Sequence, residues 1–275
     1  MRNHTSGLKR DLEVLELLAS EHAWDSGGLG VKELAQMLNR DKGQISRVCK
    51  TLEQSGLVGR DLATKRYSLG HHIYTLAMRT REAHLANLSH AALLKLVAVS
   101  EESAHLTVLR GGSVLTVRTE LAQHTMRDGR LSGVSLPALR TASGRAMLST
   151  FSNEQVDSWW QEHGVPKPRP DGMPAPKLPD TIVMKRLRRT QGSIRSFGKL
   201  MKVIRVIRKT GYAISDGELT ESIVDAAAPI YDAAGNAIGA IAVGARRERI
   251  SDRYDALGEL VREAANTVTN EWADQ

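Results

Sequence analysis

Cysteine, aromatic residues and long apolar runs are all scarce in this chain. It has one cysteine among 275 residues, which excludes an internal disulfide and a thiolate-rich metal site. No run of eighteen apolar residues occurs, and the N-terminus lacks the apolar stretch of a secretion signal. We therefore expect a soluble, cytoplasmic protein that contacts no membrane and needs no metal or other cofactor.

Acidic residues are missing from one segment. Between residues 182 and 209 there are ten Lys and Arg residues and no Asp or Glu. Because the formal net charge is +7, these ten residues leave the rest of the chain at −3. The basic character is therefore local, and the high pI alone does not indicate nucleic-acid binding. The segment is an accessory phosphate contact, a partner surface or a solvated helix face, and we favour the last interpretation.

Residues 31–70 contain a succession of short elements that together are typical of a DNA reader. Apolar residues at helical spacing predict a helix over residues 31–38, and Asp41 is a good N-cap for a second helix. Gly56 is suited to end that second helix in the left-handed conformation. The buried stripe of the second helix is predicted to contain Ile45, Val48, Cys49 and Leu52. Its outer face carries the polar residues Lys42, Gln44, Ser46, Arg47 and Lys50.

A two-stranded wing is predicted directly after this second helix. Strand-like residues 57–58 and 67–69 flank a short turn, residues 63–66, whose end is cationic. Helix, turn, helix and wing in unbroken order predict a winged helix-turn-helix, which reads DNA through its second helix. Each part alone is common in proteins that never bind DNA, but the ordered set is much rarer. An upstream stripe predicts the third core helix through Leu8, Leu12, Leu15 and Ala19.

The chain changes character after residue 70. Residues 71–88 predict a linker helix, and residues 91–101 predict a further helix that packs through Leu93, Leu94, Leu96 and Val97. Strands are expected at residues 104–109, 113–119, 211–214, 223–231 and 237–244, before a C-terminal helix. This order predicts an α+β domain with an antiparallel sheet. The proline-rich residues 165–179 are expected to form an extended surface loop. The predicted domains are residues 1–70 and 89–275, joined by the linker at 71–88.

Motifs in both predicted domains, in the same order, characterise one known family. They lie at residues 8–15, 41–61, 66–70, 141–146, 211–218 and 227–232. In these motifs the chain resembles the isocitrate lyase regulator (IclR) family of bacterial transcription factors. The resemblance implies a larger domain that is a GAF-like effector-binding domain. It also implies a homodimer or homotetramer that binds a palindromic double-stranded DNA operator.

The resemblance also implies which residues contact DNA. The DNA-contacting positions of the family fall on Lys42, Gln44, Ser46 and Arg47, with Lys65 and Arg66 in the wing. Gly43 and Gln44 replace a Ser-Thr pair that is common in the family. Because glutamine pairs bidentately with adenine and glycine permits close backbone approach, we expect an unusual operator. The predicted DNA-binding set is Lys42, Gly43, Gln44, Ser46, Arg47, Lys50, Lys65 and Arg66. For Ser46 and Lys50, simple solvation remains the alternative.

The effector pocket implied by the resemblance lies where residues 141–146 meet the strands. Its predicted residues are Leu136, Thr141, Ala142, Ser143, Ser215, Asp216, Asp225, Ala242 and Gly244. Ser215 stands where many members have an acid, Asp225 where a cysteine or small residue is usual, and Leu139 replaces a common histidine. An ionised Asp225 would repel a ligand carboxylate, which argues against small keto acids.

We expect instead a larger, partly apolar small organic effector with a hydrogen-bond donor, such as an aromatic acid derivative that carries hydroxyl, amide or amine groups. The alternative for Asp225 is a side chain that points to solvent or caps a turn. These features together predict a regulator of a catabolic operon whose operator affinity depends on the effector. Whether it represses or activates stays open.

Three other classes of function are alternatives. A non-specific architectural nucleic-acid binder could use the basic segment 182–209. A hydrolase could use Ser143, or His105 and Asp128, but the sequence has no Gly-x-Ser-x-Gly elbow, so we expect no enzyme activity. A metal site at His71 and His72 is also not expected, because adjacent histidines project from different faces of a helix.

Overall fold

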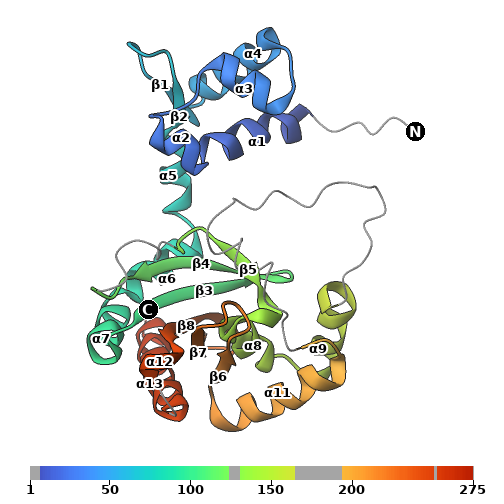
Figure 1. The fold of residues 1–275 in the computed structure, drawn as a ribbon, viewed down its shortest axis with the longest axis vertical. Coiled ribbons are helices and arrows are strands. Elements are labelled where there is room, and N and C mark those ends of the chain that lie inside the picture. The colour runs from blue at the N-terminus through green and yellow to red at the C-terminus, as the bar shows by residue number, and fades with distance from the viewer. Residues whose placement is uncertain (1–6, 124–130, 165–193, 251–252, 275) are drawn as a thin grey trace. The chain divides into compact units, whose positions relative to one another are not determined.

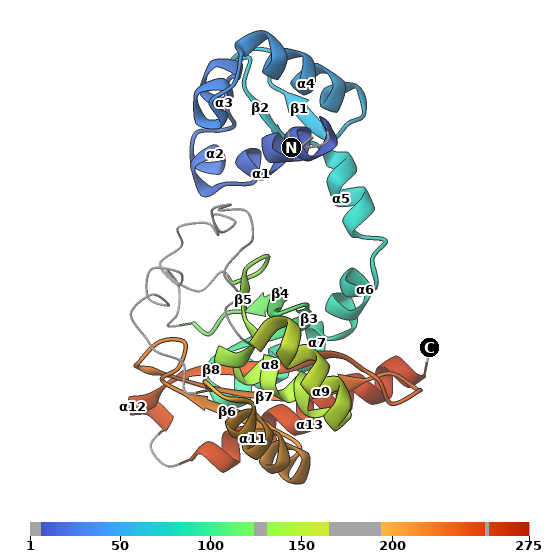
Figure 2. The same ribbon diagram turned by 90° about the vertical axis from the view of Figure 1, so that its right-hand side faces the viewer.

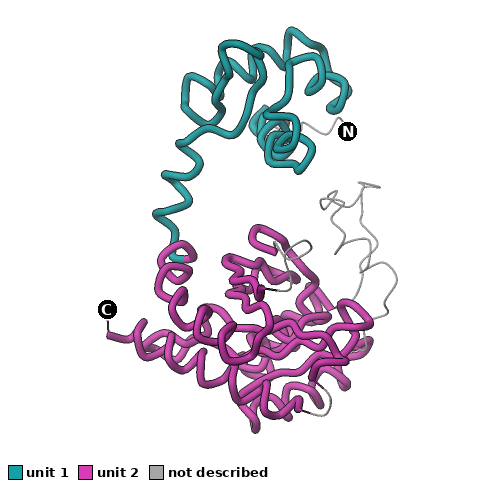
Figure 3. The backbone as a smooth tube through the Cα atoms, turned by 60° about the vertical axis from the view of Figure 1, so that its left-hand side comes forward, with its two compact units in different colours: residues 1–81 teal, residues 82–275 magenta. Residues whose placement is uncertain are grey.

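The computed structural model describes residues 7–123, 131–164, 194–250 and 253–274. The chain divides into two compact units, Met1–Arg81 and Glu82–Gln275 (Figure 3). The predicted proline-rich loop at 165–179 and residues 182–193 of the basic segment lie outside the described residues. Within the described ranges, no helix is long and apolar enough to cross a membrane.

Unit 1 is a small helical bundle that carries a two-stranded hairpin (Figure 1). Its core contains fully buried side chains from three helices and the hairpin, among them Val14, Leu34, Ile45, Cys49 and Val58. The elements in chain order are α1 Gly7–Leu18, α2 Glu21–Asp25, α3 Val31–Leu38, α4 Lys42–Gln54, β1 Val58–Arg60, β2 Tyr67–Leu69 and α5 His71–Ala77.

The helix-turn-helix between α3 and α4 forms as the sequence predicts. Asn39 adopts the left-handed conformation that ends α3, with φ of 52°. The Asp41 carboxylate then accepts a hydrogen bond of 3.0 Å from the Gln44 backbone N–H, which caps α4. Gly56, with φ of +71°, follows the C-terminus of α4. Cys49 is fully buried in the core, as predicted, and burial raises its pKa to about 11.

The predicted buried stripe of α1 is wrong. Leu8 and Leu12 are 68% and 46% exposed, and Ala19 is exposed as well. The buried side chains are Val14 and Leu18, one helical turn apart. Leucines occur on more than one face of α1, so helical spacing alone did not show which face is buried.

The predicted linker helix over residues 71–88 is divided into α5 and α6 Arg81–Leu88. Thr80 lies at the break. Its backbone N–H and its hydroxyl both donate to the Ala77 carbonyl, at 3.1 Å and 2.7 Å. These bonds span three residues, and they replace the four-residue bonds that would have continued α5.

Unit 2 contains a six-stranded antiparallel sheet in the order β5-β4-β3-β8-β7-β6, which confirms the predicted α+β class. Helices cover both of its faces (Figure 2). The strands are β3 Ser103–Arg110, β4 Ser113–Glu120, β5 Ser135–Pro137, β6 Ala213–Asp216, β7 Ile223–Tyr231 and β8 Ala237–Arg246. The remaining elements are α7 His90–Ser100, η1 Ala138–Arg140, α8 Ala142–Ser149, α9 Asn153–Trp159, the π-helical turn η2 Trp160–Gly164, α11 Phe197–Thr210, α12 Arg247–Ile250 and α13 Tyr254–Ala273.

The two faces of the sheet differ in composition. Large apolar residues such as Leu106, Ile230 and Ile241 pack against α7 and α13. The residues that alternate with them face α8 and are smaller, including Ala227 and Ala242. Small residues on this face let α8 lie close to the sheet, so any space for a ligand would lie between the two.

The packing of α7 differs from the prediction at one residue. In α7, Leu93 and Leu96 are buried as predicted, but Leu94 is 47% exposed.

In α8, Gly144 approaches η1 so closely that a β-carbon on it would lie 2.2 Å from the Ala138 carbonyl oxygen. No side chain fits there, so α8 can occupy this position only with glycine.

Candidate functional sites

The outer face of α4 is the first candidate site. Lys42, Ser46, Arg47 and Lys50 are exposed there, and Gln44 is partly exposed. In the described part of the chain, none of these five side chains has a hydrogen-bond or ion-pair partner. They are therefore available for phosphate oxygens and base edges. Gly43 is exposed beside them, and a β-carbon on it would meet Asp41 Oδ1 at 3.0 Å.

The hairpin turn after α4 is held by Asp61. Its carboxylate accepts hydrogen bonds from the backbone N–H groups of Ala63 and Thr64, at 3.0 Å and 2.6 Å, and these bonds lower its pKa. Lys65 follows in the left-handed conformation, with φ of 59°. Within the described residues the Lys65 ammonium has no hydrogen-bond partner, so this cation is free at the tip of the wing.

Arg66 is placed differently from the other predicted DNA-binding residues. Its Nε donates to the Gly28 carbonyl at 2.8 Å, and its Nη2 lies 3.1 Å from the Glu33 carboxylate. Glu33 also accepts from the Gly30 backbone N–H, which lowers the pKa of Glu33. The Arg66 guanidinium therefore joins the wing to the start of α3. Its neighbour Lys65 makes no such hydrogen bond or ion pair within the described residues.

The second candidate site is a cavity of about 40 Å³ between α8 and the sheet. Six of the predicted effector-binding residues line it: Leu136, Thr141, Ala142, Ser143, Asp225 and Ala242. Ser215 and Asp216 do not. Ser215 donates to the Arg140 carbonyl at 3.5 Å, and Asp216 is exposed and pairs with Arg247.

Gly244, also predicted, lies at the edge of the cavity between two polar side chains. A β-carbon there would lie 3.1 Å from Asp225 Oδ1 and 3.9 Å from His105 Nε2. Because 3.1 Å is closer than ordinary van der Waals contact, a side chain at position 244 would crowd the Asp225 carboxyl. Gly244 is not among the residues that line the cavity.

His105 is the most important lining residue that the sequence interpretation missed. Its Nδ1 lies 3.1 Å from Thr119 Oγ1. Burial lowers its pKa to about 4, so the ring is neutral at pH 7. The alternation of His105 and Thr107 with buried Ala104 and Leu106 was the available signal, because it indicates a polar face on a buried strand. The other lining residues are Thr107, Val114, Thr116, Leu131 and Leu219.

Asp225 also faces the cavity, and it makes no hydrogen bond within the described residues. Burial raises its pKa to about 7; nearby Arg145 opposes this rise and Glu218 adds to it. The carboxyl therefore changes protonation state near neutral pH. Asp225 is partly buried, and its side chain lines the cavity.

The N-terminus of α8 supplies hydrogen-bond donors to the same cavity. Thr141 caps it by accepting from the Gly144 backbone N–H at 3.1 Å. The backbone N–H groups of Ala142 and Ser143 have no partner in the described structure, and neither does the Ser143 hydroxyl. Ser143 is only 5% exposed. Unpaired donors at a helix N-terminus form a favourable site for an anion.

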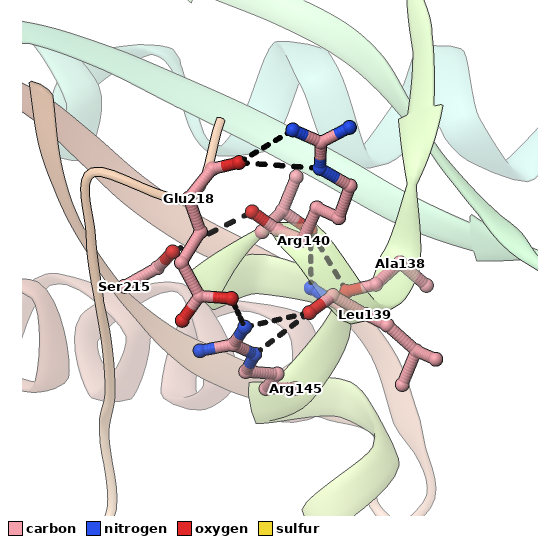
Figure 4. A network of polar contacts seen from close by, with 8 residues as sticks. Ala138, Leu139, Arg140, Arg145, Ser215 and Glu218 are labelled. Carbon is pink, nitrogen blue, oxygen red and sulfur yellow. Dashed lines mark hydrogen bonds and ion pairs between the residues drawn. The ribbon is translucent and has the colours of Figure 1, made fainter. Parts of the chain in front are cut away.

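A network of polar contacts holds one wall of the cavity (Figure 4). Arg145 in α8, 3% exposed, pairs with Glu218 and donates from Nε and Nη2 to the Leu139 carbonyl at 2.9 Å and 2.7 Å. Arg140 in turn donates to the Glu218 carbonyl at 3.1 Å and 2.8 Å. These contacts fix the β6–β7 loop, and with it the lining residue Leu219, against η1 and α8.

Two wider grooves lie elsewhere on unit 2. One of about 370 Å³ lies between α7 and α13, where its charged residue Arg249 is paired with Glu102 at 2.9 Å. The other, of about 630 Å³, runs along α7 and contains exposed Leu94 and Leu121. Neither groove contains any of the predicted effector-binding residues, so the cavity beneath α8 is the better candidate for a small ligand.

Chemistry of other kinds finds little support in the described residues. They contain no group of three His, Cys, Asp or Glu side chains placed to hold a metal ion. Ser143 has no hydrogen-bonded histidine there to act as its base.

Comparisons with known proteins match both units. The family model for the bacterial transcriptional regulator IclR C-terminal region matches residues 78–170 and 178–270, and the MarR family model matches residues 21–61. The HTH-type transcriptional regulator BhcR of Paracoccus denitrificans is 26% identical over 264 residues, which are 95% of this chain and 85% of the relative. The glycerol operon regulatory protein of Streptomyces coelicolor is 29% identical over 280 residues, which are 98% of each chain.

The fold also has a solved counterpart. An IclR homologue from Microbacterium hydrocarbonoxydans, complexed with 4-hydroxybenzoate, superposes with a TM-score of 0.75 at 18% identity. The match covers 97% of this chain and 99% of that one, so the two share one fold over nearly their whole length.

Proposed function

Because the chain belongs to the IclR family of bacterial transcriptional regulators, we propose that it controls a catabolic operon by binding a palindromic operator as a dimer or tetramer. It is a DNA-binding regulator and not an enzyme. The proposal has two parts, a DNA-reading helix in unit 1 and an effector cavity in unit 2.

The DNA-reading part rests on one observation, the unengaged polar face of α4. Lys42, Arg47 and Lys50 bind phosphates or guanine edges there, and Gln44 and Ser46 reach base edges. Gly43 lets the helix N-terminus approach the DNA backbone closely. In the wing, Lys65 supplies the phosphate contact. Arg66 acts through its contacts with Glu33 and Gly28, which position the wing.

The effector part rests on two kinds of polar group in the cavity, the backbone donors at the α8 N-terminus and the Asp225 carboxyl. A carboxylate binds the free N–H groups of Ala142 and Ser143, and apolar Leu136 and Leu219 contact the body of the ligand. A donor group at the far end reaches Asp225. An aromatic acid fits this pattern, and the homologue that contains 4-hydroxybenzoate offers a concrete probe.

The cavity must widen to admit such a ligand. Its 40 Å³ holds only a few water molecules, whereas ligand pockets are typically about 300 Å³ or more. The β6–β7 loop and α8 are the walls that must separate. A ligand that favours one arrangement of these walls over another shifts the population of the protein, and operator affinity changes with it.

Fluorescence anisotropy on the protein's own upstream intergenic DNA and on a shuffled copy tests the DNA-reading part. We expect binding to the native sequence that is tighter by about a thousandfold at moderate salt. Equal and steeply salt-dependent binding to both sequences would support the architectural alternative instead.

A further inference from the structure

The tip of the wing presents a leucine to solvent. Leu62 lies in the turn between β1 and β2, and its side chain is 80% exposed. No other large aliphatic side chain that the structure describes is more exposed. Single exposed leucines are common on protein surfaces, so the exposure matters only together with what surrounds Leu62.

The turn that carries Leu62 is fixed by hydrogen bonds on both sides of it. The Asp61 carboxylate accepts from the backbone N–H groups of Ala63 and Thr64, at 3.0 Å and 2.6 Å, and from the Thr64 hydroxyl at 2.8 Å. The Lys65 backbone N–H donates to the Asp61 carbonyl at 2.9 Å. These bonds hold the backbone of the turn in one conformation, so the leucine is presented to solvent by a rigid support.

Two exposed cations flank Leu62 in the hairpin. The Arg60 guanidinium lies 5.3 Å from the centroid of the Tyr67 ring, and Lys65 closes the turn on the other side. Within the described residues, neither cation has a hydrogen-bond or ion-pair partner. Arginine and lysine side chains bind phosphate oxygens, but an apolar side chain gains nothing from a phosphate. Leu62 is therefore suited to contact what lies between two phosphate backbones, which is the floor of a DNA groove.

The minor groove is the groove that this hairpin fits. The hairpin projects from the helices of unit 1, and β1 begins four residues after α4 ends (Figure 1). When α4 lies in the major groove, a hairpin beside it faces the neighbouring minor groove. That groove is only about 6 Å wide, and the other residues at the tip, Ala63 and Thr64, are small. Proteins that bind there often insert a leucine or another apolar side chain between two base pairs, which kinks the duplex.

We propose that Leu62 inserts into the minor groove beside the α4 contact and partly separates one base step, so that it selects operators in which this step unstacks easily. Arg60 and Lys65 bind the phosphates on either side of that step. The inference rests on the proposed operator binding and adds a residue that determines specificity without a hydrogen bond to a base. Because TA and CA/TG steps are the most flexible, we expect one of them at this position in each half-site.

Anisotropy titrations of the full-length protein on its own operator, mapped within the upstream intergenic DNA by footprinting, test the role of the side chain. Leu62→Ala should weaken operator binding by about tenfold, because the buried apolar contact is lost, and should leave the slope of log affinity against log salt unchanged. Lys65→Ala should instead reduce that slope by about 1. Leu62→Met should restore most of the affinity, whereas Leu62→Gln, of similar size but polar, should not.

Ala63→Ser is the matched control, because it changes an exposed residue of the same turn and keeps the leucine. It should bind the operator as the wild type does. Urea unfolding of Leu62→Ala should give the wild-type midpoint, since the side chain is 80% exposed.

A change in the DNA separates insertion from a merely structural role. Operators are compared in which the flexible step beneath the wing is replaced by AA, with every base that α4 contacts kept. The wild type and Lys65→Ala should prefer the flexible step by about fivefold or more, whereas Leu62→Ala should bind both sequences equally. With 2-aminopurine at that step, emission should rise when the wild type binds and stay low with Leu62→Ala.

The proposal fails if Leu62→Ala binds like the wild type, if it keeps the preference for the flexible step, or if it reduces the salt slope as Lys65→Ala does. It also fails if Leu62→Ala changes the oligomeric state in sedimentation velocity, because Leu62 would then contact protein. In each of these cases, specific operator binding that is weakened by Lys42→Ala and Arg47→Ala would leave the proposed function standing. Absence of specific binding by the wild type would instead show that the proposed function itself is wrong.

Discussion

Arg66 and Glu33 form an ion pair of 3.1 Å that joins the wing to the first turn of α3, while Lys65, the adjacent cation, has no hydrogen-bond or ion-pair partner among the described residues. The two residues should therefore respond differently to removal. Arg66→Ala should lower the free energy of unfolding of unit 1 by about 1 kcal/mol, because a partly exposed pair and a hydrogen bond to Gly28 are lost. Lys65→Ala should leave stability unchanged and weaken DNA binding. Urea unfolding and anisotropy measure the two effects, and equal stability loss in both variants would contradict this assignment.

The salt dependence of DNA binding should depend on α4 and not on α11. Each of Lys42→Ala and Arg47→Ala should reduce the slope of log affinity against log salt by about 1, because each removes a phosphate contact. Lys199 and Lys202 on α11 are also exposed and have no ion-pair partner within the described residues, so their alanine variants are matched controls that should leave the slope unchanged. A reduced slope in the α11 variants would instead identify the basic segment as a DNA contact.

Asp225 should make unit 2 less stable as the pH rises. Its folded pKa of about 7 is above the usual value of 3.8, so the folded state binds the proton more tightly than the unfolded state does. This contribution to stability is complete below about pH 4 and is lost as the pH rises towards 7. Asp225→Asn should therefore stabilise the protein by about 4 kcal/mol at pH 8 and have little effect at pH 4. Urea unfolding at both pH values measures the difference, and equal effects would show that Asp225 is not the titrating group.

Gly144 should tolerate no side chain. The 2.2 Å approach of a β-carbon to the Ala138 carbonyl means that Gly144→Ala must displace α8 or η1. We expect a loss of several kcal/mol, in the range for overpacked cores, together with loss of ligand binding. Gly198→Ala on α11, where a β-carbon would meet nothing within 4 Å, is the matched control. Thermal unfolding compares the two variants, and similar melting temperatures would show that α8 can move without cost.

The features that the sequence predicted correctly depend on local signals. The Asp41 cap, the Gly56 helix end and the wing depend on neighbours within a few residues, so a pattern of residue types is enough to predict them. Five of the six strands of unit 2 were predicted for the same reason, whereas the short β5 was not.

Choices that depend on tertiary packing could not be predicted. Leu12 and Val14 both look apolar in α1, and only the position of α3 decides which is buried. Arg66 and Lys65 are adjacent cations, and only Glu33, more than thirty residues away in sequence, distinguishes them. The place of His105 in the cavity lining could not be predicted, because it depends on which face of β3 lies beneath α8.

The central claim is that a ligand in the cavity beneath α8 changes how tightly α4 holds DNA. The most direct test is the anisotropy titration of operator DNA with and without saturating 4-hydroxybenzoate at pH 6, with ligand binding established by calorimetry. We predict that operator affinity shifts by 5- to 150-fold, which corresponds to a coupling of about 1–3 kcal/mol. Binding of the ligand that leaves operator affinity unchanged would contradict the account.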